Sequence, residues 1–414
     1  MRILHLVHRA WPYHGGAERY VMEHALAGER WGHSSVVCTT DAWDMSWFTG
    51  KVGGHIERRE DTHEGVRIIR FPVRHPPFQD ILRGLLRRTV RCGEDRFFYP
   101  NPFVPSMGRW LAGESGFDTV HTNAMPFILH AGWEHAVKRG CRLVSVPHAN
   151  VGEKYRRTDA LRYFDGCQAR ILRESCFTVA QSRFERDLYL DLGVPPERIH
   201  LSGSGIDPSE FTGADGNRAR NGMGLEGPIV LSLTAHCSDR GTRHILEAFR
   251  AAVEGGLQAT LVLAGPVLPD ARRILEEMVP GDEVLERRVV VTGYVRQDRR
   301  IDLIKAADLV VLPSRLDCFG IVLLEAWMLE RPVIGCWSGA MPDLVEEGSD
   351  GFLVPFGDPV TLAHRIRILM ENRELASSMG ERGRRKVEAC WTWDRITDDF
   401  YRRLSCCYAG EAES

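Results

Sequence analysis

Short apolar runs alternate with segments of helical pattern along nearly the whole chain, and this alternation is the strongest constraint on its fold. In the first half the runs cover residues 3–7, 35–39, 66–71, 119–121, 143–146 and 177–180. A second series follows residue 208, at residues 229–233, 259–263, 289–292, 309–312 and 332–335. Strands that alternate with helices favour a parallel sheet, and runs that are apolar at every position are typical of strands covered on both faces. The sequence therefore predicts an α/β protein with two doubly wound domains.

Length and composition fit this prediction. A chain of 414 residues is too long for one core and suits two or three domains of ordinary size. Apolar residues make up 43% and charged residues 26%, as in globular proteins. The formal net charge of −3 provides no general attraction to nucleic acid or to anionic lipid, so we expect no nucleic-acid partner.

The cysteines and the amino terminus both favour a cytoplasmic protein. The eleven cysteines are scattered without metal-binding spacing, and only Cys406 and Cys407 are close together in the sequence. Cysteines beside apolar residues, such as Cys38, Cys141 and Cys336, are expected to be small buried side chains in a reducing compartment. The chain starts directly with a strand-like run rather than a secretion signal, and no apolar run is long enough to span a membrane.

Two glycine-rich and polar segments separate the halves. Residues 202–211 and 212–227, the second with five glycines, predict a linker or hinge. The expected domains are residues 1–207 and 208–394, and residues 395–414 form a final helix that returns to the first domain. That helix has an amphipathic pattern, with apolar Trp393, Ile396, Phe400 and Leu404 on one face.

Asp317 and Glu325 are the most specific candidates for chemistry. They lie eight positions apart, one in the loop after the apolar run 309–312 and one in the helix that follows. In open α/β sheets, ligands bind at the carboxyl ends of the strands. A carboxylate next to the apolar residues 321–324 needs a partner if it is buried, and sugar hydroxyls are suitable hydrogen-bond donors. The alternative is a solvated glutamate on the outer face of the helix.

Gly15 and Gly16 occupy the first turn between a strand and a helix. Glycine lets the backbone approach a ligand closely, and the amino terminus of a helix presents free N–H groups to an anion. A tight turn that simply requires glycine is the alternative interpretation.

Taken in order, these motifs resemble glycosyltransferase family 4. The family has two acidic residues of the same spacing with a Phe-Gly pair between them, here Phe319 and Gly320. The other matching segments are residues 15–18, 204–207 with Phe211, Arg240-Gly241 with 245–249, 331–334, 338–343, and Trp393 at the start of the last helix. The resemblance implies a GT-B fold of two Rossmann-like domains facing a cleft. It also implies a retaining hexosyltransferase that uses a nucleotide-sugar donor and needs neither a metal nor a further cofactor.

The resemblance also implies roles for residues of the second domain. Glu325 would hold the ribose hydroxyls of the nucleotide, and Asp317 would hold hydroxyls of the transferred sugar, where the family usually has glutamate. Backbone N–H groups around Phe319 and Gly320 would meet the diphosphate. In the first domain, Gly16 would approach the donor phosphates.

The largest departure concerns two basic residues that the family directs at the diphosphate. Arg240 stands where the family has a lysine, and Ala235 stands where it has an arginine. The missing cation would weaken stabilisation of the leaving group by a few kcal/mol, roughly the scale of one electrostatic donor. His236 or Arg243 could compensate, and Arg240 can bind phosphate through two parallel hydrogen bonds.

Residues of the first domain complete the predicted site. His148 follows an apolar run and matches a family histidine that meets the donor sugar, which suits an imidazole near neutral pH. Glu18, His121 and Asn123 are expected on the acceptor side, for a small-molecule, glycan or lipid-linked acceptor.

Residues 81–91 carry basic side chains on one helical face and leucines on another. This pattern fits either peripheral contact with a membrane or, as the more ordinary interpretation, a helix on the core with a solvated basic face. Two other functions remain open from the sequence: a nucleotide-sugar epimerase-like isomerase and an inactive homologue that only binds the donor.

Overall fold

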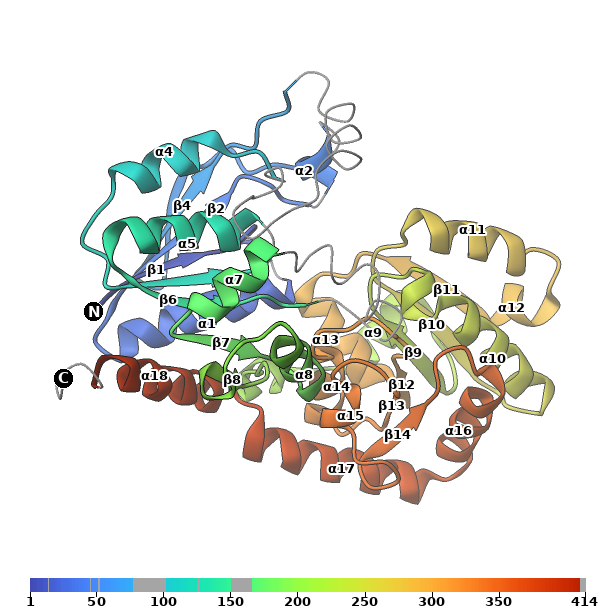
Figure 1. Ribbon diagram of the computed structural model, residues 1–414. Helices are drawn as coiled ribbons and strands as arrows, with labels where there is room; N and C mark the ends of the chain where they lie inside the picture. Colours follow the sequence, from blue (N-terminus) through green and yellow to red (C-terminus); the bar gives the residue numbers. More distant parts are fainter. Residues whose placement is uncertain are drawn as a thin grey trace. The chain divides into compact units, whose positions relative to one another are not determined.

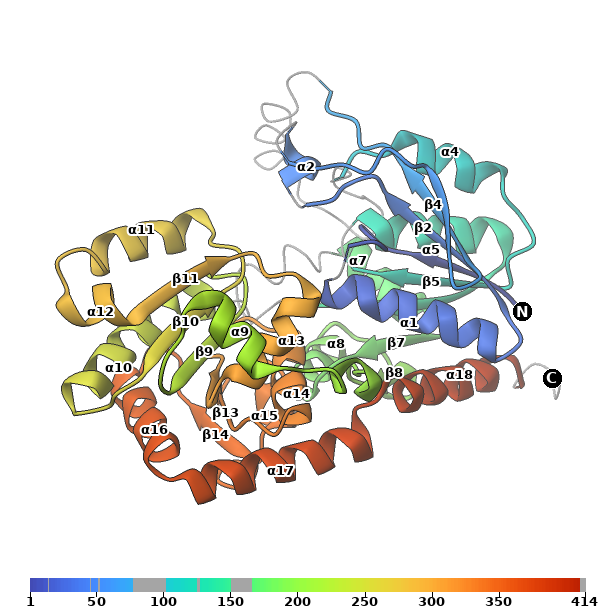
Figure 2. The same cartoon turned by 180° about the vertical axis from the view of Figure 1, so that it is seen from behind.

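The computed structural model describes residues 1–13, 15–44, 46–50, 53–76, 102–124, 127–149 and 166–409. The chain divides into two compact units, shown from opposite sides in Figures 1 and 2. The first unit comprises Met1–Ala149, Tyr155–Gly203 and Ile396–Ser414, and the second comprises Asn150–Lys154 and Ser204–Arg395. The basic segment 81–91 lies outside the described residues.

The first unit is built on an eight-stranded sheet. Its strands are β1 (Arg2–Leu6), β2 (Ser34–Thr40), β3 (Glu60–His63), β4 (Val66–Phe71), β5 (Thr119–Asn123), β6 (Arg142–Val146), β7 (Phe177–Ala180) and β8 (Ile199–Leu201). Their order is β3-β4-β2-β1-β5-β6-β7-β8, and every pairing is parallel except that of β3 with β4. The crossover helices required by parallel pairing cover both faces of such a sheet.

Helices connect these strands. They are α1 (Gly16–Arg30), α2 (Ser46–Thr49), α4 (Pro105–Gly113), α5 (Phe127–Arg139), α7 (Gly166–Glu174), α8 (Arg183–Asp191), a 3₁₀ turn (Pro196–Arg198) and the final α18 (Trp393–Ala409). The predicted amphipathic face of α18 is buried: Phe400 packs edge-on against Phe177 of β7, with ring centres 5.6 Å apart.

The second unit contains a six-stranded, entirely parallel sheet. The strands are β9 (Ile229–Leu233), β10 (Thr260–Ala264), β11 (Val289–Gly293), β12 (Leu309–Val311), β13 (Val333–Cys336) and β14 (Gly351–Val354), in the order β11-β10-β9-β12-β13-β14. Alternate residues of β9 belong to different apolar cores, because Leu231 packs in one cluster and Val230 in the other. The sheet is therefore covered on both faces, and the predicted doubly wound fold is confirmed.

The helices of the second unit are α10 (Thr242–Glu254), α11 (Pro269–Met278), α12 (Glu283–Arg288), α13 (Gln297–Ala306), α14 (Ile321–Met328), α15 (Met341–Leu344), α16 (Pro359–Glu371) and α17 (Arg373–Cys390). Two 3₁₀ turns (Pro208–Phe211 and Ser238–Arg240) and helix α9 (Gly216–Met223) complete the unit.

Helix α9 corrects the prediction of a linker at 212–227. Asp215 caps its amino terminus by accepting hydrogen bonds from the Asn217 and Arg218 N–H groups, and Gly224 ends it in the left-handed region at φ 62°. Arg218 then pairs with Asp302 of α13, which anchors the helix to the unit. The glycines and polar residues that indicated a hinge are thus the start and stop signals of a short helix.

The predicted strand runs all correspond to observed strands, and their ends agree within two residues. Three strands were not predicted: β3, β8 and β14. Strand β3 is a polar edge strand, and β8 has only three residues, so neither carries a long apolar run. Strand β14 is buried along its length, and its Phe-Leu-Val run after glycine was a detectable signal.

Candidate active site

The loop between β12 and α14 carries the acidic pair of the second unit. Ser314 fixes the start of the loop, since its hydroxyl donates to the Leu316 carbonyl at 3.0 Å. The loop ends at Gly320, which adopts φ 88° as the residue before the first turn of α14. A side chain at this position would strain the backbone, so glycine is needed to direct the loop into the helix.

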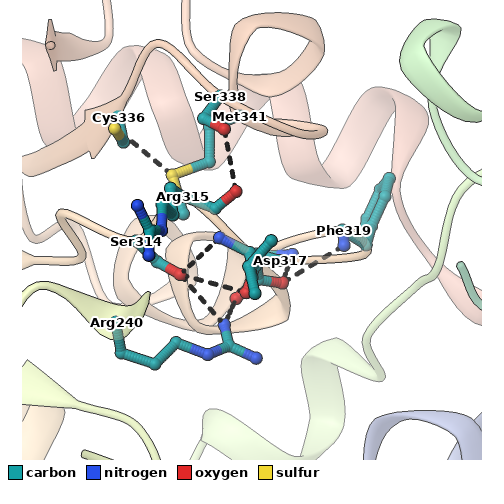
Figure 3. Close-up of polar contacts among 10 residues, drawn as sticks. Arg240, Ser314, Arg315, Asp317, Phe319, Cys336, Ser338 and Met341 are labelled. Carbon is teal, nitrogen blue, oxygen red and sulfur yellow. Dashed lines mark hydrogen bonds and ion pairs between the residues drawn. The ribbon is translucent and has the colours of Figure 1, made fainter. Parts of the chain in front are cut away.

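Asp317 is the centre of a polar cluster at the end of this strand (Figure 3). Its carboxylate forms an ion pair with Arg240 and accepts hydrogen bonds from the N–H groups of Phe319 (3.2 Å) and Gly320 (2.7 Å). The two N–H groups predicted to meet a diphosphate therefore already hold a carboxylate. The loop is a place where the backbone binds an anion.

Glu325 lies on α14 with only 2% of its surface exposed. The alternative of a solvated glutamate on the outer face of the helix is therefore wrong. Its carboxylate forms an ion pair with Arg300 of α13, whose side chain remains 22% exposed. A buried carboxylate without a partner would be costly, so Arg300 explains how Glu325 is tolerated among apolar neighbours. No motif in the sequence indicated Arg300.

Arg240 reaches Asp317 from the loop after β9. It ends a 3₁₀ turn, and Gly241 follows in the left-handed region at φ 74°. A Cβ atom at Gly241 would lie 2.4 Å from the Pro313 carbonyl oxygen, so this glycine lets the two loops approach each other. The neighbouring carboxylate of Asp239 binds Arg315 rather than Arg240.

Ala235, at the position of the missing cation, and the two residues that could compensate for it, His236 and Arg243, have different surroundings. Ala235 is exposed. His236 is buried, and burial lowers its pKa to about 4, so the ring is neutral near pH 7. Arg243 forms an ion pair with Glu277 on the surface at 2.7 Å. Arg240, by contrast, forms its ion pair with Asp317 of the acidic loop.

In the first unit, Gly15 caps α1 and Gly16 is its first residue. Glu18 in the first turn is 6% exposed, and its carboxylate binds the Arg9 guanidinium at 2.7 Å. Arg9 in turn lies over the Tyr13 ring, 3.9 Å from the ring centre. A Cβ atom on Gly15 would come within 2.2 Å of a Glu18 oxygen, so the loop is shaped around this carboxylate.

His148 and Asn123 meet at the carboxyl ends of β6 and β5. The His148 Nε2 atom lies 3.3 Å from the Asn123 Oδ1 atom. Burial lowers the pKa of His148 to about 4, and its backbone adopts φ 49°, a strained conformation for a histidine. Such strain at the end of a strand is typical of functional positions.

Glu185 of α8 supports this loop and was not indicated by the sequence. Its carboxylate accepts hydrogen bonds from the N–H groups of Ala149 and Gln181, both at 2.7 Å. Burial raises the pKa of Glu185 to about 7.

His121 lies two residues before Asn123 on β5. It is fully buried, with its Nδ1 atom 2.9 Å from the Nδ1 atom of His5, and its ring also packs against Phe400. The structure thus brings His148 and Asn123 together and places His121 in a core cluster of histidines.

Both units of the chain match known glycosyltransferase domain families. Residues 15–205 match the glycosyl transferase 4-like domain, and residues 227–372 match the glycosyl transferases group 1 domain. The chain is a group 1 glycosyltransferase. The two matches fall on the two units, one carrying the Glu18 loop and the other the acidic pair.

Curated relatives of this glycosyltransferase are transferases of diverse names. It is 28% identical to a D-inositol 3-phosphate glycosyltransferase of Streptomyces bingchenggensis over 365 residues, which cover 79% of this chain and 77% of that protein. It is 30% identical to an alpha-D-kanosaminyltransferase of Streptomyces kanamyceticus over 194 residues, or 45% of this chain and about half (49%) of the relative's length. These similarities favour a transferase over an isomerase.

Solved structures support the GT-B fold of this glycosyltransferase. Anabaena HepE in complex with UDP-glucose superposes with a TM-score of 0.76 at 19% identity, over 98% of this chain and 100% of that chain. The sucrose-phosphate synthase of Thermosynechococcus elongatus gives 0.76 at 21% identity, over 99% of each chain. Within the described residues, no helix combines the length and apolarity needed to cross a membrane.

Proposed function

We propose that this glycosyltransferase moves a hexose-type sugar from a nucleotide-diphosphate sugar to a hydroxyl group, with retention of configuration and without a metal ion. The observation that carries the proposal is the acidic pair of the second unit. Asp317 forms an ion pair with Arg240, and Glu325 forms one with Arg300. Both pairs belong to the loop and helix that follow a strand of the parallel sheet, where α/β folds bind ligands.

The donor nucleotide is proposed to bind at Glu325. A carboxylate that is held rigidly by Arg300 can accept two hydrogen bonds from the vicinal hydroxyls of a ribose. The bound UDP-glucose in Anabaena HepE, a protein of the same fold, supports a nucleotide sugar as donor.

The diphosphate is proposed to bind at the N–H groups of Phe319 and Gly320 and at Arg240. These donors bind the Asp317 carboxylate in the structure, which supports their ability to hold an anion. On donor binding, Asp317 would exchange these contacts for hydroxyls of the transferred sugar. Arg240 would then stabilise the charge that grows on the leaving phosphate, which is itself a suitable base for the acceptor hydroxyl.

The acceptor is proposed to bind the first unit, near Glu18, Asn123 and His148. The neutral imidazole of His148 can donate or accept a hydrogen bond, and Arg9 holds the Glu18 carboxylate in place. We propose a small-molecule, glycan or lipid-linked alcohol as the acceptor class. One relative is named for D-inositol 3-phosphate and another for the kanosaminyl group that it transfers, so the relatives are compatible with this broad class.

The test measures nucleotide release from a panel of UDP-, GDP- and ADP-sugars, with and without alcohol acceptors. Transfer should require an acceptor, and the anomeric proton of the product should show by NMR the configuration of the donor. Conversion of the donor sugar without an acceptor would instead indicate an isomerase. Binding of a donor without turnover across the panel would indicate an inactive homologue.

A pair of variants tests the donor site directly. Glu325→Gln should weaken nucleotide binding by about 1.5–3 kcal/mol, roughly ten- to hundredfold, because hydrogen bonds to a charged group are lost. Glu330→Gln is the matched control, since Glu330 also pairs with an arginine, Arg384, but lies beyond the end of α14. Unchanged affinity of Glu325→Gln in calorimetry would contradict the donor assignment.

A further inference from the structure

One glutamate of the first unit departs from the ordinary pattern of a helix start. Helix α8 begins after Ser182, whose hydroxyl accepts a hydrogen bond from the Glu185 N–H group at 3.1 Å. A serine followed three residues later by a glutamate is the pattern of a capping box, in which the glutamate side chain returns to the N–H group of the capping serine. The Glu185 carboxylate is used differently, and this difference indicates a role beyond the start of the helix.

Both oxygens of the Glu185 carboxylate hold backbone N–H groups outside the helix. The Gln181 N–H donates to Oε2 and the Ala149 N–H donates to Oε1, each at 2.7 Å. Gln181 directly follows β7, and Ala149 lies in the loop after the neighbouring parallel strand β6. One carboxylate therefore ties together the segments that follow two adjacent strands.

The double hydrogen bond requires a carboxylate. An ionised glutamate can accept on both oxygens, whereas a glutamine has one acceptor oxygen and would turn its NH2 group towards one of the two N–H donors. Glu185 is 1% exposed and Ala149 is 6% exposed, so an N–H group that loses its partner here is poorly hydrated, which is costly. Glu185→Gln is thus a change of nearly constant volume that breaks one of the two bonds.

The bond to Ala149 acts directly on the backbone of His148. The Ala149 N–H belongs to the peptide group that follows His148, so its direction depends on the ψ angle of His148. His148 has φ 49°, in the left-handed region that a histidine adopts only where surrounding contacts fix it. Its side chain has contacts of its own, with Nε2 3.3 Å from the Asn123 Oδ1 atom and the Tyr20 ring packed edge-on at a centre-to-centre distance of 5.2 Å. The bond from Ala149 to Glu185 adds the backbone contact to this set.

We propose that Glu185 positions His148 for the transfer reaction, by holding the peptide group after His148 and so keeping the imidazole beside Asn123. The inference rests on the proposed role of His148 in the acceptor site. Because Glu185 is buried, it acts through His148 rather than by contact with a substrate, so it is a positioning residue. Its loss should slow transfer without weakening nucleotide binding, since the donor is proposed to bind the second unit.

The first test compares two changes at the start of α8. Kinetics are measured at pH 8, above the value of about 7 to which burial raises the pKa of Glu185, so that the carboxylate is charged. Misplacement of a reacting group by about 1 Å can cost about a hundredfold in rate, so Glu185→Gln should lower kcat by about ten- to hundredfold. The KM for the acceptor and the nucleotide affinity in calorimetry should change little. Ser182→Ala is the matched control: it removes the helix cap and should lower the melting temperature, but it leaves both carboxylate bonds and should leave kcat nearly unchanged.

A double variant shows whether Glu185 acts through His148. The protein with both His148→Ala and Glu185→Gln should transfer as slowly as His148→Ala alone, because a positioned group that is absent cannot be misplaced. Losses that multiply in the double variant, or a normal kcat of folded Glu185→Gln, would overturn the inference and leave the role of His148 intact. Full activity of His148→Ala would instead remove the proposed role of His148, and with it any meaning of its position for transfer.

NMR of the protein labelled at its histidines tests the positioning without turnover. The His148 ring signals, assigned by their loss in His148→Ala, should shift in Glu185→Gln and stay in place in Ser182→Ala. Unchanged His148 signals in folded Glu185→Gln would overturn the inference. If Glu185→Gln does not fold, Glu185→Asp takes its place, since it keeps the charge but is one methylene too short to hold both N–H groups. Normal kcat and unchanged His148 signals in Glu185→Asp would then refute the positioning role.

Discussion

At the scale of single residues, the candidate site consists of charges that hold one another. Arg240 binds Asp317, Arg300 binds Glu325, and Arg9 binds Glu18. The carboxylates were predicted from motifs, but two of the three arginines were not. A motif records spacing along the chain, whereas these partners are fixed by the packing of other elements.

Arg240→Ala should be severe for catalysis. Because position 235 is alanine, Arg240 is the remaining basic residue of the motif. Loss of the Arg240 side chain should therefore cost about 2.7–4 kcal/mol of transition-state stabilisation, roughly a hundred- to thousandfold in kcat. Substrate affinity should fall less, because charge on the leaving phosphate grows as the bond breaks. Arg243→Ala, three residues further on and paired with Glu277 on the surface, is the matched control. Near-normal turnover of a folded Arg240→Ala protein would exclude the diphosphate role.

Arg300→Met should destabilise the second unit. It leaves the Glu325 carboxylate buried without its ion-pair partner, at a cost of about 3 kcal/mol, the lower end of the range for a broken buried pair. The cost lies at the lower end because 22% of the Arg300 side chain remains exposed to solvent. The double variant Arg300→Met/Glu325→Gln should recover much of the loss in urea unfolding, since no unpaired charge remains. If the losses of unfolding free energy from the two single changes simply add in the double variant, the ion pair contributes no coupling energy.

At the scale of elements, close packing of α14 against α17 fixes the helix that carries Glu325. A Cβ atom on Gly383 of α17 would lie 2.0 Å from the Trp327 ring of α14. Trp327 is fully buried and donates to the Asp350 carbonyl at 2.8 Å, so it cannot move freely. A single glycine thereby sets how closely the two helices approach.

Gly383→Ala and Gly222→Ala should have opposite effects on stability. Gly383→Ala overpacks the helix contact and should cost about 1–3 kcal/mol of unfolding free energy. Gly222 in α9 has no atom within 4 Å of the added methyl group, so Gly222→Ala should stabilise by about 0.5–1 kcal/mol through helix propensity. Thermal unfolding of both variants measures this difference. A neutral Gly383→Ala would show that α14 can shift.

At the scale of the whole molecule, the first unit has several buried histidines, and its stability should depend on pH. Burial lowers the pKa of His24 to about 3, and its Nδ1 atom lies 2.7 Å from the Tyr20 carbonyl oxygen. An unfolded histidine takes up a proton below about pH 6.5, whereas the folded one does not. As pH falls from 6.5 towards 3, protonation thus favours the unfolded state, by about 2 kcal/mol for this residue at pH 5.

His24→Gln removes this proton uptake. The variant should be less stable than the unchanged protein at pH 7, and the difference should shrink by about 2 kcal/mol at pH 5. Urea unfolding at a series of pH values measures the two curves. His364→Gln, a change on the exposed face of α16, is the control for the loss of a histidine outside the buried core. Parallel curves for His24→Gln would show that His24 accepts a proton in the folded state.

The proposed roles of the two units predict a division between binding and transfer. Glu18→Gln should lower the rate of transfer but leave nucleotide affinity unchanged, because Glu18 belongs to the first unit. Glu325→Gln should lower both. Calorimetry with the nucleotide and a transfer assay on the same preparations separate the two effects. Equal loss of nucleotide affinity in both variants would remove the proposed division.

The sequence by itself determined the class of fold and the position of the acidic pair. Fully apolar runs are local signals of strands buried on both faces, and a motif between a strand and a helix fixes which residues lie at the end of the sheet. The prediction of a hinge at residues 212–227 was wrong, because glycine is common both in hinges and at the ends of short helices.

Only the tertiary structure decided which groups are paired. Arg300 reaches Glu325 because α13 packs beside α14, and Glu185 of α8 supports the loop after β6. Each contact joins elements whose relative position depends on the packing of the whole unit. Local propensity and spacing carry no record of that packing, so these partners became visible only in the folded chain.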